Sequence, residues 1–255
     1  MAQKATSTAQ PTSGGLLENV KTIVYALLIA IGIRTVAFEP FNIPSASMVP
    51  TLLIGDYLFV SKYSYGYSTY SLWPSMHLFS GRIFGRVPER GDVAVFRLPA
   101  NPRLDYIKRI VGLPGDRIQM KAGQLYINGT LVPRAAAGTV EAVEGPDSIP
   151  VLSKLYHETL PNGREHDIAK KQDQYGLNDT QEFRVPEGAV FAMGDNRDNS
   201  ADSRDPTSGV GYIPMENLVG RAEFIFFSFE ASEPWWKFWD WPMEVRWSRL
   251  LHGIS

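Results

Sequence analysis

A short apolar run near the N-terminus is the feature that most constrains how this chain can fold. The run is uncharged from Thr22 to Ile33, and it extends to Phe38 if the guanidinium of Arg34 reaches a membrane interface. Its length of about 17 residues is the lower limit for a helix that spans a bilayer. We therefore expect residues 16–38 to form a transmembrane anchor. Residues 1–15 lack any hydrophobic period, which is typical of a disordered tail.

A cleaved signal peptide and a buried core helix are the other interpretations of this run. A signal peptide carries small residues just ahead of its cleavage point. The residues that follow the run are instead bulky, charged or cyclic, namely Arg34, Phe38, Glu39 and Pro40. The flanking charges favour a cytoplasmic N-terminus only weakly, because Lys4 and Lys21 on one side are set against Arg34 on the other.

Composition narrows the classes of function. The formal net charge is -2, from 25 basic and 27 acidic side chains, so no strong field draws the chain to nucleic acid. The absence of cysteine excludes disulfides, thiolate zinc sites and cysteine nucleophiles. Any covalent catalysis would therefore use an oxygen or a nitrogen nucleophile.

After Pro40 the sequence changes to short strand-like runs separated by Gly, Pro and Asn. The predicted strands are Tyr57 to Val60, Asp92 to Phe96, Tyr106 to Val111, Gln124 to Ile127, Ala189 to Met193 and Ala222 to Phe229. Asn128 and Gly129 directly follow one of these runs, and this dipeptide favours a tight hairpin turn. The pattern predicts a mainly β protein behind the N-terminal helix.

Two stretches depart from this pattern. Between Pro133 and Pro186 the density of charge, Gly and Pro rises, which indicates an inserted subdomain or a long excursion. We place the insert at residues 119–186, so that the main β domain comprises residues 39–118 and 187–230. The last stretch, residues 231–255, holds five of the six tryptophans: Trp235, Trp236, Trp239, Trp241 and Trp247.

This tryptophan-rich segment has two interpretations. Indole rings favour the headgroup zone of a membrane, where the flat apolar body and the polar N–H group are both satisfied. A core cluster of tryptophans is the alternative. With an anchor at the other end of the chain, we favour the membrane interface.

Histidine offers no clear base or metal ligand. The four histidines, His77, His157, His166 and His252, are scattered, and none lies at metal-ligand spacing. We expect each of them in a surface or loop position. The chain also lacks a phosphate-binding loop and a dinucleotide fingerprint, so nucleotide chemistry has no signature here.

Three segments combine polar side chains with proline or glycine residues, and each segment lies next to apolar residues. In the first, Pro44 to Leu52, two prolines fix the backbone on either side of Ser45 and Ser47. Such a rigid turn can present Ser47 as a nucleophile. An ordinary serine-rich loop between a helix and a strand is the alternative.

The second segment, Asp105 to Asp116, contains a candidate buried lysine. Period-2 alternation places Lys108 on an apolar and aromatic face with Tyr106 and Ile110, while its neighbour Arg109 points the other way. Burial would lower the lysine pKa from about 10.4, and a free amine can act as a general base. A lysine that reaches solvent from a strand edge is the alternative.

The third segment, Met193 to Asp205, is a dense run of short polar side chains. Such residues form hydrogen bonds with their own backbone, which predicts a tight loop. The run could also bind calcium through its acidic residues. The basic residues Arg197 and Arg204 argue against calcium.

Together these segments resemble the bacterial type I signal peptidases, which are membrane-anchored serine proteases with a Ser/Lys dyad. The match is carried by Pro44 to Leu52, Tyr106 to Asp116 and Gly194 to Arg204, with Arg90 to Phe96 as a weaker fourth block. The blocks follow the family's order between the anchor and Phe229. By this resemblance Ser47 is the nucleophile and Lys108 its general base. Ser45 and the backbone N–H of Ser47 would form the oxyanion hole.

The resemblance implies further roles. Ser200 resembles the hydroxyl that orients the lysine, and Asp202 and Arg204 resemble the family's supporting ion pair. Ala46 stands where the family more often has glycine, which removes no catalytic atom. Apolar residues near the dyad that could bind substrate are Phe41, Ile43, Met48, Leu52, Leu58, Tyr106 and Ile107.

The resemblance also implies an activity and a location. The chain would remove signal peptides from exported preproteins at the outer, periplasmic face of a bacterial cytoplasmic (inner) membrane, held there by a single span. It implies an antiparallel β catalytic domain interrupted by a second β subdomain, membrane lipid as a partner, and no metal or organic cofactor. Another Ser/Lys hydrolase, such as a self-cleaving regulator or an amidase, and a non-catalytic membrane-tethered β module remain alternatives.

Overall fold

The computed structural model describes residues 16–71, 80–142, 151–171, 177–230 and 241–254. The predicted tail, residues 1–15, lies outside these ranges, and so do Trp235, Trp236 and Trp239. In the tryptophan-rich segment the side chain of Trp247 is described, and it is exposed. The membrane-interface interpretation of that segment therefore stays a prediction.

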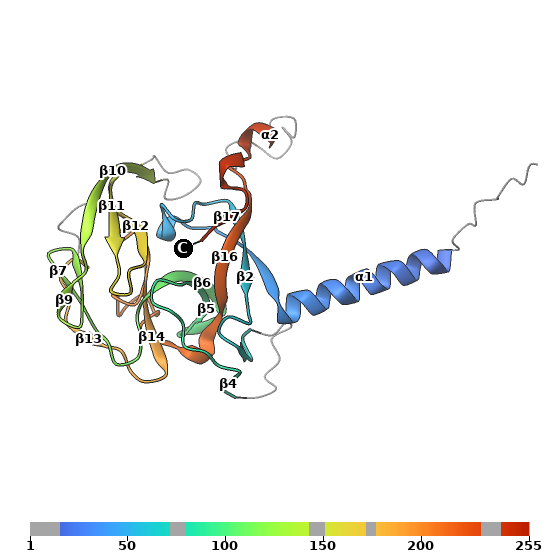
Figure 1. Cartoon of the computed structure of the whole chain (residues 1–255), viewed down its shortest axis with the longest axis horizontal. Helices are drawn as coiled ribbons and strands as arrows, with labels where there is room; N and C mark the ends of the chain where they lie inside the picture. The colour runs from blue at the N-terminus through green and yellow to red at the C-terminus, as the bar shows by residue number, and fades with distance from the viewer. Residues whose placement is uncertain (1–15, 72–79, 143–150, 172–176, 231–240, 255) are drawn as a thin grey trace, which may run out of the picture.

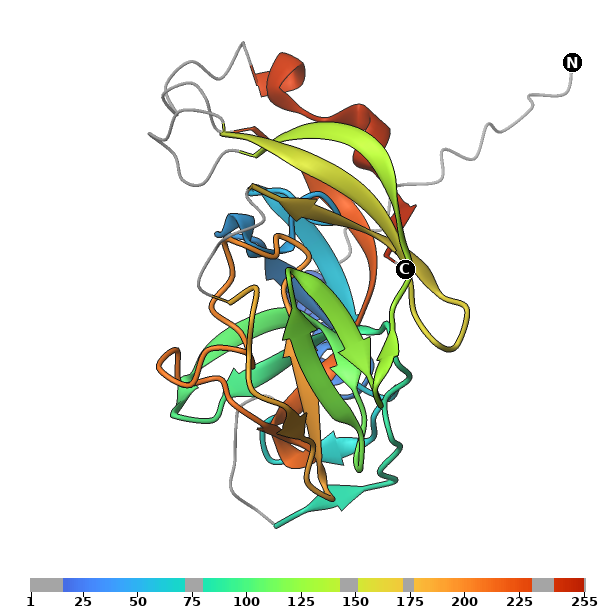
Figure 2. The ribbon, with the colours of Figure 1, turned by 90° about the vertical axis from the view of Figure 1, so that its left-hand side faces the viewer.

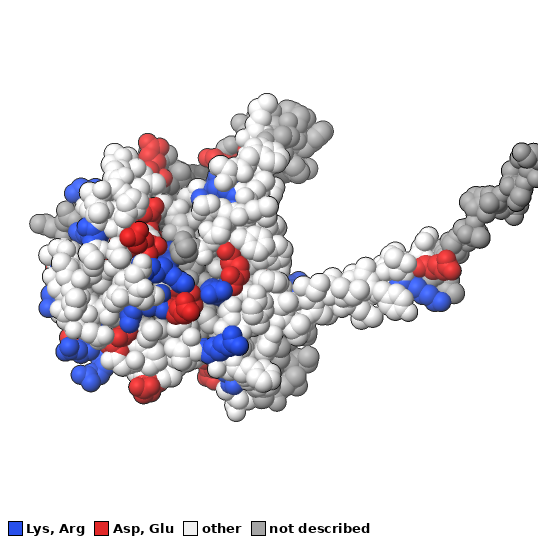
Figure 3. All heavy atoms as spheres, viewed as in Figure 1, with Lys and Arg blue, Asp and Glu red and all other residues white. Residues whose placement is uncertain are grey.

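The apolar run forms helix α1 (Leu16–Val36), which projects from the β body as a separate arm (Figure 1). Within it, Glu18–Val36 is long and apolar enough to cross a membrane, and none of that stretch is buried. Figure 3 shows charged side chains on the visible face of the arm only near its ends. Because the helix packs against no core, the core-helix interpretation is excluded, and the helix is consistent with a membrane anchor.

The rest of the described chain is mainly β, as predicted, and its named strands pair in antiparallel fashion. Eight strands form the largest sheet, in which seven follow the order β1-β2-β16-β5-β6-β14-β15 and β17 pairs with β16. Their bounds are β1 (Phe38–Asn42), β2 (Asp56–Ser61), β5 (Val93–Leu98), β6 (Asn101–Gly112), β14 (Ala189–Met193), β15 (Ile213–Pro214), β16 (Leu218–Ser228) and β17 (His252–Gly253).

Two smaller sheets lie on the side of the body away from α1, as Figures 1 and 2 show. One has the order β13-β7-β8-β9, and the other has the order β10-β11-β12. Their bounds are β7 (Arg117–Lys121), β8 (Gln124–Ile127), β9 (Thr130–Leu131), β10 (Arg134–Ala142), β11 (Val151–Thr159), β12 (Glu165–Lys170) and β13 (Phe183–Arg184). These strands come almost entirely from the predicted insert, whose boundaries stay a prediction.

The remaining elements are short. They are a hairpin of β3 (Tyr67–Ser68) and β4 (Arg82–Ile83), helix α2 (Trp241–Glu244), and the 3₁₀ turns Ala46–Met48, Met215–Asn217 and Trp247–Arg249. The C-terminal segment returns to the main sheet, where β17 pairs with β16 and the guanidinium of Arg249 forms an ion pair with the buried carboxylate of Asp56.

The six predicted strands all overlap observed ones, and the hairpin at Asn128 and Gly129 is confirmed. These two residues connect β8 to β9 with φ values of 55° and 81°, as a tight two-residue turn requires. Strand β6 begins earlier than predicted, at Asn101, because its first five residues are all exposed and so lack the alternating pattern of a half-buried strand.

Strand β6 positions the candidate site because it lies between β5 and β14 in the main sheet. In the register of these pairs Lys108 lies opposite Ala94 of β5, and Arg109 lies opposite Met193 of β14. Both neighbours are buried apolar residues, so this end of β6 is enclosed. The sheet thus carries two adjacent cationic side chains of one strand into the interior.

Candidate active site

The turn that carries Ser47 connects β1 to β2 and is held by apolar side chains. Ile43, Met48 and Leu52 are buried in one core cluster with residues of β2, β5 and β16. A backbone hydrogen bond from Leu52 N to Met48 O, at 2.9 Å, closes the turn. Because both sides of the turn are anchored in the core, the hydroxyl of Ser47 has a fixed place.

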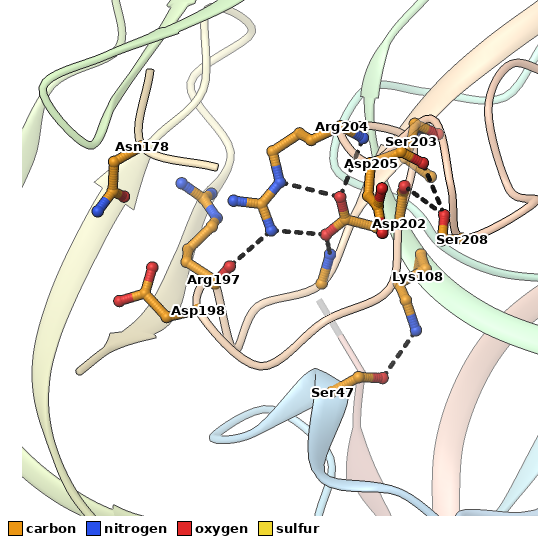
Figure 4. Close-up of polar contacts among 12 residues, drawn as sticks. Ser47, Lys108, Asn178, Arg197, Asp198, Asp202, Ser203, Arg204, Asp205 and Ser208 are labelled. Carbon is orange, nitrogen blue, oxygen red and sulfur yellow. Dashed lines mark hydrogen bonds and ion pairs between the residues drawn. The ribbon is translucent and has the colours of Figure 1, made fainter. Parts of the chain in front are cut away.

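Ser47 and Lys108 point toward one another (Figure 4). The Nζ atom of Lys108 lies 2.7 Å from the Oγ atom of Ser47, although the residues are 61 positions apart in sequence. The amine also donates a hydrogen bond to the carbonyl oxygen of Ile107, at 2.9 Å. Only 3% of Lys108 is exposed. The structure therefore brings together the two residues predicted to form a dyad.

Burial is the main influence on the protonation of Lys108. Loss of water around the ammonium group lowers the pKa of Lys108 from 10.5 to about 8. The carboxylates of Asp202 and Asp195 favour the ammonium form and oppose this shift, and the guanidinium of Arg204 adds to it. At mildly alkaline pH a large fraction of the amine is therefore neutral, and a neutral amine can accept a proton from Ser47.

A cavity of about 400 Å³ opens beside the pair. Its walls come from the segment 41–47, from β5 and β6, and from Asn199 and Ala201. The last two belong to the predicted loop of residues 193–205, which we call the polar loop. Ser45 also lines it, and the Oγ atoms of Ser45 and Ser47 lie 3.4 Å apart. A reacting carbonyl placed beside Ser47 would thus lie next to a second hydroxyl.

The predicted substrate-binding residues divide into two groups. Phe41, Ile43, Tyr106 and Ile107 line the cavity. Met48, Leu52 and Leu58 have no exposed surface and belong to the core cluster that supports the turn, so in this structure they do not line the cavity. Their closeness to the dyad in sequence correctly placed these three residues near the site. It could not show whether they line the cavity or belong to the core beneath the turn.

The polar loop is fixed by a buried ion pair within it. The carboxylate of Asp202 accepts hydrogen bonds from Nε and Nη2 of Arg204, at 2.9 and 2.7 Å, and from the backbone N–H of Gly194, at 2.9 Å. Arg204 also donates to the carbonyl oxygen of Arg197, at 2.6 Å (Figure 4). The two residues predicted as a supporting pair thus tie both ends of the loop together.

Ser200 is close to the dyad but makes no hydrogen bond with Lys108. Its Oγ atom is buried and has no hydrogen-bond partner within the described ranges. A Cβ atom at Gly194 would lie 2.2 Å from this hydroxyl and 2.5 Å from the carbonyl oxygen of Ser47. The role of Ser200 in orienting the lysine therefore stays a prediction, and Gly194 fills a place that admits no side chain.

A second buried ion pair was not predicted. The guanidinium of Arg109 donates from Nε and Nη2 to the two carboxylate oxygens of Asp195, at 2.9 and 2.8 Å. Thr51, from the turn that carries Ser47, donates to the same carboxylate at 2.6 Å. The alternation along β6 correctly placed Arg109 opposite Lys108, but no pattern in the sequence indicated that this second face is buried too.

The expectation of surface or loop positions for the histidines is wrong for His166. His157 and His252 lie on strands and are exposed, but His166 of β12 is buried between the carboxylates of Glu158 and Asp195. His77 lies outside the described residues. These three histidines line a second cavity of about 280 Å³ with Thr51 and the C-terminal segment. Across the described ranges, no group of three His, Cys, Asp or Glu side chains could hold a metal ion.

Comparison with known proteins places this chain in one family. The model of the family described as signal peptidase, peptidase S26, matches residues 16–227. Signal peptidase I of Rickettsia prowazekii (strain Madrid E) is 41% identical over 252 residues, which cover 91% of this chain and 92% of that protein. Signal peptidase I of Rickettsia akari (strain Hartford) is 45% identical over 222 residues, which cover 83% and 79% of the two chains.

Among solved structures, a signal peptidase I from Enterococcus faecalis V583 is 24% identical to this chain. The match has a TM-score of 0.32 and covers 53% of this chain and 97% of that chain.

The contact at Gly194 leads to a test of the site. We expect Gly194→Ala to lower the rate at which a serine-directed acylating probe modifies Ser47 by about 100-fold, because a displacement near 1 Å at a reacting group costs that much. Labelling rates measured by mass spectrometry check this. Gly85→Ala is the control, since the three atoms nearest to its Cβ would be side-chain atoms of Arg82 at 3.5 to 3.6 Å, which is ordinary contact. Equal labelling of the two variants would contradict a tight fit at Gly194.

Proposed function

The chain belongs to the signal peptidase family, peptidase S26, whose activity is the removal of signal peptides, and we propose that Ser47 and Lys108 carry out that activity here. The observation that carries the proposal is the 2.7 Å separation of Lys108 Nζ and Ser47 Oγ in a buried setting beside a cavity. A serine hydroxyl needs a base to become a nucleophile, and a desolvated lysine can serve in place of the usual histidine.

The reaction proceeds through an acyl-enzyme. The neutral amine of Lys108 takes the proton of Ser47 as Oγ attacks the carbonyl carbon of the scissile peptide bond. The resulting ammonium then gives a proton to the leaving amine, and the mature protein departs. Lys108 next takes a proton from a water molecule as that water attacks the ester. The ammonium returns the proton to Oγ of Ser47 as the ester bond breaks, which releases the signal peptide and restores the neutral amine.

The tetrahedral intermediates carry negative charge on the former carbonyl oxygen. We assign its stabilisation to the hydroxyl of Ser45 and the backbone N–H of Ser47. The support for this assignment is the position of Ser45 in the cavity, 3.4 Å from the nucleophile oxygen. Preorganised donors of this kind typically contribute about 10²- to 10³-fold in rate.

The supporting residues act on the amine. Asp202 and Arg204 hold the loop that covers Lys108, and the proposed role of Ser200 is to accept or donate a hydrogen bond at Nζ when substrate is bound. The buried hydroxyl of Ser200, which lacks a hydrogen-bond partner in the part of the chain described, supports this role. The hydroxyl of Ser200 carries no charge, and this matters because a charged partner would shift the amine of Lys108 toward or away from the ammonium form.

Substrates are proposed to bind as an added strand. Strand β1 stands at the end of the main sheet's order, so its outer edge is available within that sheet. The cavity next to β1 is lined by Phe41, Ile43, Tyr106 and Ile107, which suit small apolar side chains at the third and first positions before the cleaved bond. The proposed partners are therefore preproteins that bear such signal peptides.

The proposed location is the bacterial inner membrane, with one span and the catalytic domain, residues 39–118 and 187–230, on the periplasmic side. The exposed apolar helix α1 and its direct connection to β1 support a membrane-anchored protein. The tryptophan-rich segment is proposed as a second contact with lipid, and the exposed ring of Trp247 agrees with it.

The dyad is tested by removing either partner. We expect Ser47→Ala, Lys108→Met and Lys108→Arg each to lower kcat for preprotein cleavage in detergent by about 10⁴-fold or more, because each removes one half of a unit that acts jointly. The arginine variant fails because a guanidinium stays protonated. Ser64→Ala and Lys121→Met, which do not line the cavity, should keep near-normal activity. Substantial cleavage by Ser47→Ala would refute the assignment.

The pH dependence follows from the protonation of Lys108. Its pKa is lowered to about 8 by burial, and only the neutral form is a base. The rate should therefore fall about tenfold per pH unit below that value and level off above it. A profile of kcat/KM between pH 5 and 10 checks this. A midpoint between pH 6 and 7 that disappears with a histidine-directed reagent would instead identify a histidine as the base.

The second lipid contact is tested without the anchor. A chain that lacks residues 1–36 keeps β1 intact, and we expect it to float with liposomes and to shift its tryptophan emission to shorter wavelength on binding. The same chain with Trp235, Trp236 and Trp239 changed to Ser should lose most of this binding. Equal flotation of the two proteins would show that the tryptophans are not the lipid contact.

A further inference from the structure

Two strands of the predicted insert meet the polar loop beside the catalytic turn. Ala169 of β12 exchanges backbone hydrogen bonds with the loop, because its N–H donates to Asp195 O at 2.9 Å and its carbonyl accepts from Arg197 N at 2.9 Å. Glu158 of β11 reaches the same loop with its side chain. The insert therefore packs against the catalytic part of the chain, because β11 and β12 both form hydrogen bonds with the polar loop.

Glu158 and Arg197 form a buried bidentate pair. The Nη1 atom of Arg197 donates to Oε2 of Glu158 at 3.0 Å, and its Nη2 atom donates to Oε1. The side chains are 1% and 2% exposed. Burial alone would raise the pKa of Glu158, but the charge and hydrogen bonds of Arg197, with His166 3.4 Å away, lower it to about 2, so the carboxylate is ionised. A fork of this kind fixes direction as well as distance.

Arg197 is adjacent to the residue that holds the nucleophile turn. The backbone N–H of Asn196 donates to Ser47 O at 3.1 Å, and its side-chain Nδ2 donates to Ala46 O at 3.1 Å. Asn196 therefore donates hydrogen bonds to two consecutive carbonyl oxygens, those of Ala46 and Ser47. A shift of Arg197 would be transmitted to these bonds through one peptide unit.

We propose that Glu158 is a positioning residue for Ser47, and that it acts through Arg197 and Asn196 so that the insert sets the geometry of the dyad. This inference rests on the proposed role of Ser47 as the nucleophile. Among the residues that the structure describes, none of the insert lines the cavity, whose lining comes from the segment 41–47, β5, β6 and the polar loop. Its effect on the reaction is therefore one of alignment.

This proposal makes a kinetic claim that differs from a purely structural role. Glu158 itself does not line the cavity, so its loss should keep KM within about twofold. The attack of Ser47 should slow, and a displacement near 1 Å at a reacting group lowers kcat about 100-fold. A residue that only stabilises the fold would change the fraction of active enzyme but not the kcat of the folded molecules.

The experiment compares variants of the full chain in detergent. Glu158→Gln keeps the size of the side chain, and Arg197→Lys keeps the charge but loses the fork. We expect both to lower kcat between about 10- and 100-fold, with the active fraction measured by burst labelling of Ser47. Arg164→Gln is the matched control, because it breaks an ion pair of the insert with Asp92, at 2.8 Å, that does not involve the loop. It should keep near-normal kcat.

The route through Asn196 is tested with a double variant. If Glu158 acts through Asn196, Glu158→Gln combined with Asn196→Ala should be no slower than the slower single variant, because both remove the same alignment. Multiplied losses in the double variant, or normal kcat in both Glu158→Gln and Arg197→Lys, would overturn the proposal. Ser47→Ala with retained activity would instead overturn the proposed function, so the two failures are distinguishable.

Discussion

The exclusion of water from the amine of Lys108 is the physical condition on which this structure depends. The shift of its pKa from 10.5 to about 8 corresponds to about 3 kcal/mol against the ammonium form. Such a penalty is sustained only where protein atoms cover most of the surface of the group. The position of β6 between β5 and β14 and the cover provided by the polar loop supply that packing. The carboxylates of Asp202 and Asp195 keep the shift from going further.

Buried ion pairs hold the loop over the lysine, and three of them join a guanidinium to a carboxylate: Arg109 with Asp195, Arg197 with Glu158, and Arg204 with Asp202. Each pair takes at least one member from residues 195–204. Buried pairs of this kind contribute little net stability, because desolvation offsets most of their attraction. Their bidentate geometry instead fixes orientation. We interpret the three pairs as the reason that a loop without regular secondary structure can align a catalytic group.

The sequence predicted the parts of this molecule that follow local patterns. The exposed apolar helix, the six strands and the hairpin at Asn128 and Gly129 follow from hydrophobic periodicity and turn chemistry. The pairing of Ser47 with Lys108 was expected from motif resemblance supported by the alternation along β6, and the structure brings the two together.

The parts that were missed depend on contacts between distant segments. Nothing local to β11 or β12 indicates that Glu158 and His166 are buried, because their partners lie on a loop about 30 to 40 positions away. Met48, Leu52 and Leu58 were assigned to the substrate cavity for a related reason. Apolar residues near a nucleophile look alike in sequence whether they face a ligand or the core.

The short connection between α1 and the catalytic turn has a consequence for which bonds can be cut. Ser47 follows Val36, the last residue of the helix, by 11 positions (47 − 36). Even a fully extended chain of that length spans at most about 40 Å. With α1 in a bilayer, Ser47 is tethered at a limited height above the lipid. The choice of bond then depends on distance as well as on side chains. A peptide bond can be cleaved only if it lies at the height of Ser47 above the lipid while the substrate's own membrane segment stays in the bilayer.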